Sequence, residues 1–195
     1  MTHLHTNISR ITREMRNKKN KHLSPVLWFT GLSGAGKSTL ANALESRLFH
    51  VDVQVTVLDG DGIRSGLCRD LGFSDNDRTE NIRRVAELAK LFSESGILTI
   101  AAFISPTIAV RAMAREIIGT NFIEIFVATS LSVCESRDVH GLYKKARDGK
   151  ISDFTGVHSL FEEPKSPDLS IDTASRQVDD CVDQIMKYLQ ERKLL

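Results

Sequence analysis

The stretch Gly31-Leu-Ser-Gly-Ala-Gly-Lys-Ser38 carries the strongest signal in this chain of 195 residues. It matches G-x-x-x-x-G-K-[ST], the pattern of loops that hold nucleotide phosphates. Its glycines let successive backbone N–H groups turn toward phosphate oxygens. Lys37 supplies a mobile positive charge for the terminal phosphates, and the Ser38 hydroxyl can bind Mg²⁺. The pattern therefore predicts a site for a nucleoside triphosphate.

The sequence on either side supports this interpretation. An apolar run at 25–30 is typical of a short strand, and 39–48 has the apolar spacing of a helix. A strand, a loop and a helix in this order place bound phosphates at a helix N-terminus. The alternative, a glycine turn without a ligand, does not require this order.

The remaining sequence alternates strand-like and helix-like segments. Strands are predicted at 53–58, 97–104, 122–127 and 169–173, and helices at 74–96, 106–118 and 177–192. This alternation predicts an α/β fold, a P-loop NTPase-type three-layer sandwich with a central parallel sheet of about five strands and helices on both faces. Ligands of such sheets bind at the carboxyl ends of the strands, here just after residues 30, 58, 104 and 127.

The predicted helix at 74–96 has further detail. Ser74 and Asp77 form a capping-box start, and Gly96 is a stop signal. Its apolar stripe consists of Ile82, Val85, Ala86, Ala89 and Phe92.

Two segments stand apart from the predicted sheet. Residues 1–24 form a basic leader, in which Ile8, Ile11 and Met15 have helical spacing. We expect a short amphipathic helix whose charges face solvent; a transit peptide or a docking segment is the alternative. Residues 138–167 are basic and long for a loop, which favours a mobile active-site lid in a single domain at 25–195.

Composition excludes several classes of protein. The formal net charge of +1 argues against a nucleic-acid or membrane partner, and no apolar run is long enough to cross a bilayer. A secretory signal is absent, and Cys68, Cys134 and Cys181 lack metal-ligand spacing. We therefore expect reduced thiols and a cytoplasmic location.

Polar residues follow the predicted strands. Asp61, in Asp59-Gly60-Asp61, can hold Mg²⁺ or accept a proton from an attacking hydroxyl, although a D-G turn explains the same letters. Arg64 adds a cation nearby. Arg78 and Asn81 are three residues apart, on a helix face that we expect to differ from the packed stripe and to point into a cleft.

Ser105-Pro106 follows the third predicted strand. Serine as N-cap and proline at the first helical position make a good helix start, which we favour over a functional serine.

Together these residues resemble the adenylylsulfate kinase family, which phosphorylates the 3′-hydroxyl of adenosine 5′-phosphosulfate (APS). The resemblance runs from about Val26 to the last helix. It is carried by the blocks 28–39, 58–64, 71–73, 77–83, 103–106, 134–138, 141–147 and 154–156.

The resemblance implies a role for each matching residue. ATP and Mg²⁺ would bind at Gly31, Leu32, Ser33, Gly34, Ala35, Gly36, Lys37, Ser38 and Thr39, with Ser38 and Asp61 near the metal. APS would contact Asp61, Gly62, Ile63, Arg64, Phe73, Arg78, Asn81, Ile104, Ser105, His140 and Phe154. Asp61 and Lys37 would serve catalysis. Ser105 matches a position assigned as a phosphoserine intermediate, and direct in-line transfer explains the same site. The resemblance also implies a homodimer.

Three positions depart from the usual family pattern. Ala35 replaces a serine, and His140 replaces a lysine before Gly-Leu-Tyr. The block Val157-His-Ser-Leu-Phe-Glu162 differs from the usual Ile-Asp-Ser-Pro-Tyr-Glu. The lid is therefore the region where family roles transfer least directly.

Two other functions use the same phosphate loop. A gluconate or shikimate kinase has no need of aromatic side chains at Phe73 and Phe154 to hold an adenine. A non-catalytic nucleotide-binding homologue has no reason to keep Lys37, Ser38 and Asp61 together.

Overall fold

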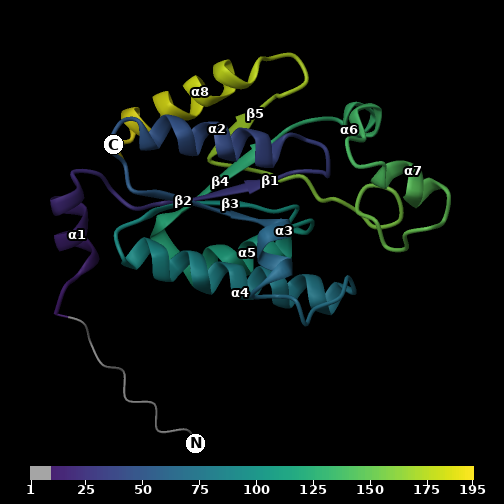
Figure 1. The fold of residues 1–195 in the computed structure, drawn as a ribbon, viewed down its shortest axis with the longest axis horizontal. Helices are drawn as coiled ribbons and strands as arrows, with labels where there is room; N and C mark the ends of the chain where they lie inside the picture. Colours follow the sequence, from purple (N-terminus) through teal and green to yellow (C-terminus); the bar gives the residue numbers. More distant parts are fainter. Residues whose placement is uncertain (1–9) are drawn as a thin grey trace, which may run out of the picture.

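The computed structural model describes residues 10–195, which form a five-stranded sheet between two layers of helices (Figure 1). The strands are β1 Val26–Thr30, β2 Val55–Asp59, β3 Leu98–Ala102, β4 Phe122–Val127 and β5 Leu169–Ile171. They lie in the order β2-β3-β1-β4-β5, and every neighbouring pair is parallel. The predicted α/β three-layer fold is confirmed.

The register of the strands brings the predicted site loops together. Ala102 of β3 lies opposite Phe29 of β1 on one side and Asp59 of β2 on the other. The chain therefore leaves these three strands at one edge of the sheet. Every residue of β1 and β3 is buried, as expected for central parallel strands with helices on both faces.

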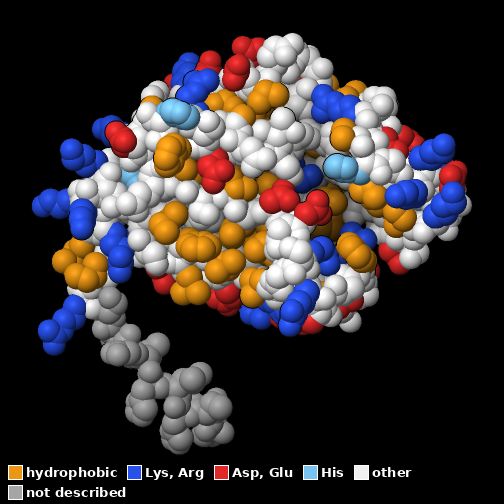
Figure 2. Space-filling view, viewed as in Figure 1, with side chains coloured by type: hydrophobic (Ala, Val, Ile, Leu, Met, Phe, Trp, Pro, Cys, Tyr) orange, Lys and Arg blue, Asp and Glu red, His pale blue; other side chains and the backbone are white. Residues whose placement is uncertain are grey.

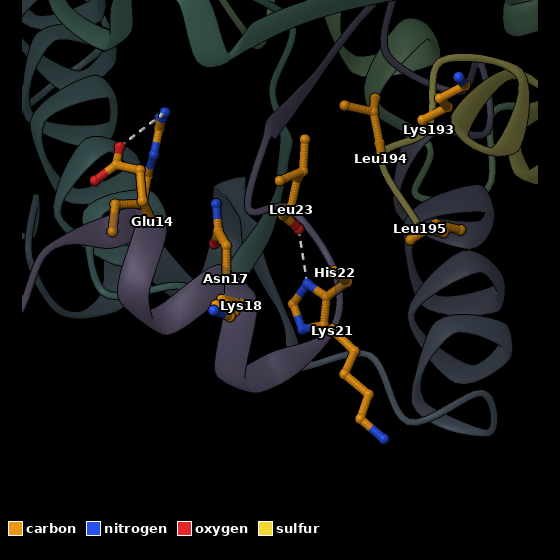
Figure 3. Close-up of a pocket in the computed structure, with 10 residues that line it drawn as sticks. Glu14, Asn17, Lys18, Lys21, His22, Leu23, Lys193, Leu194 and Leu195 are labelled. Atoms are coloured by element: carbon orange, nitrogen blue, oxygen red, sulfur yellow. Dashed lines mark hydrogen bonds and ion pairs between the residues drawn. The ribbon is translucent and has the colours of Figure 1, made fainter.

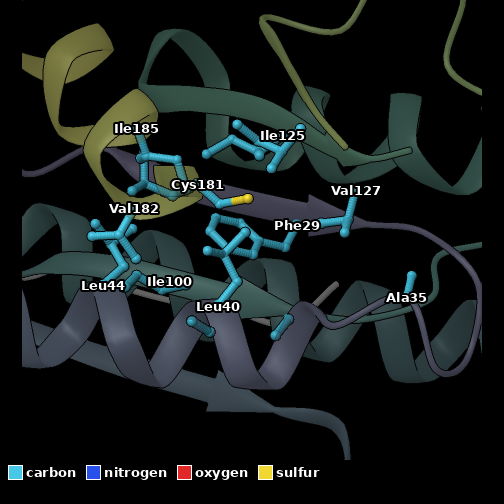
Figure 4. Packing of buried hydrophobic residues seen from close by; sticks show 14 of the residues in the cluster. Phe29, Ala35, Leu40, Leu44, Ile100, Ile125, Val127, Cys181, Val182 and Ile185 are labelled. Atoms are coloured by element: carbon cyan, nitrogen blue, oxygen red, sulfur yellow. The ribbon is translucent and has the colours of Figure 1, made fainter. Parts of the chain in front are cut away.

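Helices α2 Lys37–Phe49 and α8 Val178–Glu191 cover one face of the sheet. Figure 4 shows Leu40 and Leu44 of α2 and Ile185 of α8 packed toward Phe29 and Ile125 of the sheet. Burial of this apolar surface holds α2, and with it the loop before α2, at a fixed height above β1.

Helices α4 Asp75–Glu94 and α5 Ile108–Ile118 cover the other face, and a 3₁₀ turn at Gly119–Asn121 leads into β4. The Ser74 side chain accepts the Asp77 N–H, so the predicted cap of α4 is confirmed. The predicted stripe is buried at Ile82, Val85, Ala86 and Ala89, and Phe92 is half-buried.

Three short helices were not predicted: α3 Gly60–Ser65, α6 Leu131–Arg137 and α7 Leu142–Arg147. Each is too short to show an apolar period. Helix α3 replaces the D-G turn, because the Asp59 side chain caps it by accepting the Asp61 N–H. Helix α7 lies inside the predicted lid, where Thr155 and Ser159 form one isolated bridge.

The leader contains α1 Arg13–Asn20, as predicted, with Thr12 as N-cap. Its apolar face is not what packs, since Ile11 and Met15 are exposed; Ile8 lies outside the described residues. Asparagines attach the helix instead. Ser24 Oγ donates to Asn17 Oδ1 (2.9 Å), and Asn20 Nδ2 donates to the Gly96 carbonyl (2.9 Å).

Within residues 10–195, no helix combines the length and apolar character needed to cross a membrane. Cys68, Cys134 and Cys181 are buried free thiols.

Candidate active site

The loop between β1 and α2 has a backbone that requires glycine. Gly31 has φ +150°, and a Cβ there would lie 2.8 Å from the Val127 carbonyl oxygen. Gly34 has φ +75°, and its Cβ would lie 3.0 Å from the Cys134 carbonyl oxygen. No side chain caps the first turn of α2. Its N–H groups therefore remain free to bind an anion.

Side chains from distant parts of the chain hold this loop from behind. The Ala35 carbonyl accepts hydrogen bonds from Thr129 Oγ1 (3.2 Å) and Thr173 Oγ1 (2.7 Å). The Tyr143 hydroxyl donates to the Ser33 carbonyl (2.9 Å). Sequence reasoning missed these residues, because no local pattern links them to a loop about one hundred positions away.

The Lys37 ammonium lies inside the loop. Its Nζ donates to the carbonyls of Gly31 (2.9 Å) and Leu32 (2.7 Å). Burial lowers the pKa of Lys37 to about 8, although the charges of Cys134 and Asp59 oppose the shift. Phosphate oxygens in the loop would favour the charged form of this lysine.

The carboxylate nearest the loop is Asp59, the last residue of β2. Ser38 Oγ donates to Asp59 Oδ2 (2.6 Å). The Asp61 carboxylate, predicted near the metal, is exposed on α3, where the Asp61 N–H donates to Asp59 Oδ1 (3.1 Å). The motif Asp59-Gly60-Asp61 predicted a metal-binding carboxylate here, and the family resemblance assigned that role to Asp61 rather than to Asp59. Its position at the end of a strand beside a phosphate loop was the available signal.

Two arginines flank an exposed aromatic ring beyond α3. The Arg64 guanidinium lies 4.4 Å from the centroid of the Phe73 ring and donates to the Gly72 carbonyl (2.9 Å). The Arg78 guanidinium is 6.0 Å from the same centroid, and its Nε donates to the Phe73 carbonyl (2.8 Å). Phe73 is 64% exposed, so its ring can contact a ligand.

Arg78 also joins α4 to the predicted lid. Its Nη1 donates to Thr155 Oγ1 (3.1 Å) and its Nη2 to the Asp153 carbonyl (2.6 Å). Phe154 packs edge-on against Tyr143, with ring centroids 5.0 Å apart. Phe73 and Phe154 therefore face different partners among the described residues, Arg64 and Tyr143 respectively.

Asn81 lies one turn after Arg78, but on the packed side of α4. It is 4% exposed, beside the buried Ile82, so the expectation that it shares a separate face with Arg78 is wrong. The reason is its spacing of four residues from Val85, which belongs to the stripe. Within residues 10–195, Asn81 Oδ1 is the buried side-chain oxygen that lacks a hydrogen-bond partner. A buried acceptor of this kind suits a ligand donor.

Ser105 is not a helix cap. It has φ +39°, and it is 2% exposed. Its Oγ donates to Thr30 Oγ1 (3.1 Å) and accepts from Trp28 Nε1 (3.1 Å). The cap of α5 is Thr107, whose side chain accepts the Val110 N–H. The prediction failed because Thr107 offers the same hydroxyl two positions later, directly before the helix.

The other predicted site residues lie around these groups. Ile63 is buried in α3 next to the exposed Gly62, and Thr39 is exposed in the first turn of α2. The Ile104 carbonyl accepts from Thr30 Oγ1 (2.7 Å). His140 is exposed directly before α7.

Figure 2 shows this face hollowed between the lobe of α6 and α7 and the part formed by α3 and α4, with acidic side chains at the edge of the hollow. A separate cavity of about 460 Å³ lies at the other end of the sheet, between α1 and the C-terminus. Charged side chains such as Arg13, Glu14 and Lys18 line it, together with Leu23 and Leu194 (Figure 3).

Comparisons with known proteins show which family this chain is similar to. The profile of the family described as adenylylsulphate kinase matches residues 23–172. The adenylyl-sulfate kinase of Acaryochloris marina is 52% identical over 188 residues, 96% of this chain and 92% of the relative. That of Prochlorococcus marinus is 52% identical over 186 residues, 95% of this chain and 92% of the relative.

A solved structure shows the same arrangement of the chain. The APS kinase of Mycobacterium tuberculosis, solved with AMPPNP and APS, has a TM-score of 0.84 and 42% sequence identity. The match covers 87% of this chain and 99% of that one. The phosphate loop, the parallel sheet and these matches lead to one conclusion: the chain belongs to the adenylylsulfate kinase family.

Proposed function

We propose that the protein transfers the γ-phosphoryl group of ATP to the 3′-hydroxyl of APS, which gives 3′-phosphoadenosine 5′-phosphosulfate and ADP. The observation that carries the proposal is the exposed Phe73 ring, which lies close to the guanidinium groups of both Arg64 and Arg78. An adenine base needs an aromatic surface, and a phosphosulfate needs guanidinium groups. Gluconate and shikimate need no aromatic surface.

The loop residues fit ATP with Mg²⁺. Backbone N–H groups at 31–38 and the charge of Lys37 suit the phosphates, and Ser38 with Asp59 offers oxygen ligands of the kind that Mg²⁺ prefers. Mg²⁺ bound there would neutralise charge on the phosphates during transfer. No group of three or more His, Cys, Asp or Glu within residues 10–195 forms a metal cage. This agrees with an ion held largely by phosphate and water.

Asp61 is proposed as the base. In the transfer, the 3′-oxygen forms a bond to the γ-phosphorus as the bond to the β–γ bridging oxygen breaks, and the hydroxyl proton passes to the Asp61 carboxylate. Lys37 stabilises the charge that collects on the phosphate oxygens. The Ser105 hydroxyl is buried and hydrogen-bonded to Trp28 and Thr30. Because it is not exposed to a nucleotide, direct transfer is favoured over a phosphoserine intermediate.

The substrate contacts of the lid are proposals of the same kind. Residues 138–167 would close over both nucleotides, with Phe154 against the adenine and His140 near the anionic end of APS. Arg78 would exchange its bonds to Asp153 and Thr155 for bonds to substrate. Asn81 Oδ1 would accept a hydrogen bond from APS.

The test is an assay of ADP release from Mg·ATP with APS, gluconate or shikimate as acceptor, with the product identified by ³¹P NMR. We expect turnover with APS alone and a new phosphate resonance at the 3′ position. Turnover with gluconate or shikimate, or none with APS, would contradict the proposal.

We further propose that residues 25–195 act as one kinase domain after the leader at 1–24, and that the protein is a cytoplasmic homodimer. The buried free thiols support a reducing compartment. Sedimentation velocity tests the dimer, since a mass of about one chain at micromolar concentration would contradict it.

A further inference from the structure

A buried arginine that no proposed step uses lies between Ser105 and the end of the lid. Arg111 of α5 is 4% exposed, and its Nε pairs with Glu124 Oε1 of β4 (2.9 Å). Burial lowers the pKa of Arg111, and the Glu124 carboxylate opposes that shift. Burying an ion pair costs the desolvation free energy of both charges. A contribution to stability alone therefore does not explain why this pair is present.

The remaining donors of Arg111 reach two backbone carbonyls. Nη1 donates to the Ser105 carbonyl (2.8 Å), and Nη2 donates to the Glu162 carbonyl (2.6 Å). Arginine carries its donors on three separate nitrogens and can therefore reach a carboxylate and two separate carbonyls at once, whereas the donors of lysine all lie on one nitrogen. One side chain thus joins β4, the end of β3 and the end of the lid.

The lid return, defined here as residues 161–162, is attached at the same place by four more contacts. The Phe161 ring stacks on Phe126, with centroids 6.1 Å apart, and lies 5.8 Å from the Arg111 guanidinium. The Glu162 N–H donates to the Pro106 carbonyl (2.8 Å). The Glu162 carboxylate accepts the Ile108 N–H at the start of α5 (2.6 Å).

Ser105 is the other end of this connection. A non-glycine residue with positive φ is strained and persists only where its surroundings hold it. Arg111 Nη1 (2.8 Å) and Thr30 Oγ1 (3.4 Å) donate to its carbonyl, while Trp28 and Thr30 hold its hydroxyl. The conformation of Ser105 and the attachment of the lid return therefore share one guanidinium.

We propose that Arg111 is a positioning residue: it fixes the Ser105 turn and the lid return to each other, so that the lid closes over the acceptor from a defined base. This inference rests on the proposed function for its kinetic effect. The effect of Arg111 on the conformation of the Ser105 turn is measurable in the free protein. Because Arg111 touches no loop residue at 31–38, ATP binding is largely independent of it.

The test is Arg111→Lys, which keeps the charge beside Glu124 but cannot reach both carbonyls. The matched control is Arg115→Lys, one turn further along α5. Arg115 also pairs with Glu124 (3.7 Å) and with Asp168 (3.0 Å), and it contacts Phe122, which stacks on Trp28. Among the described residues Arg115 has no hydrogen bond to Ser105 or Glu162, whereas Arg111 donates to the carbonyls of both.

We expect Arg111→Lys to raise KM for APS about tenfold while KM for ATP changes less than about twofold. The chain has a single tryptophan, Trp28, so its emission reports the Ser105 turn in the free protein. Emission should shift in Arg111→Lys and stay unchanged in Arg115→Lys. The emission result stands even if APS proves not to be the acceptor.

Wild-type KM for APS and wild-type Trp28 emission in Arg111→Lys would overturn the proposal, whatever its melting temperature. Equal changes in both variants would also overturn it, since Arg115 shares the pair with Glu124 and the packing around Trp28 but not the hydrogen bonds to Ser105 and Glu162. If Arg111→Lys does not fold, Phe161→Leu decides, because it loosens the lid return and leaves the Arg111–Glu124 pair intact. A raised KM for APS in that variant supports the proposal, and an unchanged KM contradicts it.

Discussion

The phosphate loop and the acceptor region around Phe73 are held by different kinds of contact. Carbonyls of the loop accept hydrogen bonds from Thr129 and Thr173, which lie outside the lid, and from Tyr143 of α7. In the acceptor region, Arg64 and Arg78 donate instead to carbonyls of nearby surface segments, and the Phe73 ring is exposed.

This difference indicates whether each region has its ligand-binding conformation before the ligand arrives. The loop is already shaped before any ligand arrives, because tertiary contacts fix it from behind. The guanidinium groups of the acceptor region are bound to carbonyl oxygens that an anionic substrate can replace. We therefore infer that the phosphate loop, the ATP half of the site, is preformed. The acceptor region, the APS half, reaches its final conformation only when APS binds.

The largest effect expected in the acceptor region is that of Asp61→Asn. If Asp61 accepts the hydroxyl proton, kcat should fall by about 10²–10⁴-fold, while the affinity for ATP is kept because the loop is untouched. Asp59→Asn is the contrast, and it should mainly raise the Mg²⁺ concentration needed for half-maximal rate. Near-normal turnover of Asp61→Asn in a steady-state assay would remove it from the chemistry.

In the preformed half, Lys37→Met should lower kcat by about 10²–10³-fold, since it removes the charge that stabilises the phosphates in the transition state. The melting temperature should not fall, because Lys37 is buried at a cost to its charged form. Lys187→Met, an exposed lysine of α8, is the control. Loss of folding in Lys37→Met would contradict a loop shaped by other residues.

Ser105→Ala tests whether the Ser105 hydroxyl contributes to stability or to catalysis. Removal of the hydroxyl leaves the buried Trp28 N–H without its acceptor, which should cost about 1–3 kcal/mol of unfolding free energy by urea titration. Direct transfer predicts that activity survives. If ATP alone labels the wild-type serine, and APS releases that label at the turnover rate, a phosphoserine intermediate replaces this account.

The pKa of Lys37, about 8 in the free protein, predicts a pH effect confined to the loop. Phosphates favour the charged lysine, so Kd for ATP should rise with pH above 8, by at most about tenfold per pH unit. Calorimetry in buffers of different ionisation enthalpy should detect proton uptake on binding near pH 8. Without uptake, Lys37 is not the titrating group.

The same shift has a defined sign for stability. The folded-state pKa lies below the unfolded value of about 10.4, so between these values the unfolded chain binds more protons. The contribution of Lys37 to the unfolding free energy therefore rises with pH across this interval.

The smallest effect is expected at His140, an exposed residue of the lid. A lysine there adds a positive charge that can attract the anionic acceptor. His140→Lys should lower KM for APS a few-fold, the value of one exposed charge, while KM for ATP changes less. Equal KM values for APS in both proteins would assign the lid charge to Lys144 and Lys145.

Local patterns predicted the elements whose signals are local. The phosphate loop, the long helix with its Ser74 cap and the buried strands all follow from spacing within a few residues. The support behind the loop could not be predicted, since Thr173 and Tyr143 meet it only after folding. Ser105 and Thr107 show a third case, in which two hydroxyls compete for one cap and the backbone conformation decides.

Amide hydrogen exchange compares the two halves most directly. It would be measured for residues 31–38 and 150–156 in the free protein, with a non-hydrolysable ATP analogue, and with APS added to that complex. Because the N–H groups at the start of α2 are free to bind phosphate, we predict that 31–38 gains protection with the ATP analogue alone, whereas 150–156 gains protection only when APS is added. No gain at 31–38 until APS is added, or a gain at 150–156 with the ATP analogue alone, would contradict a preformed ATP half and an acceptor half completed by its substrate.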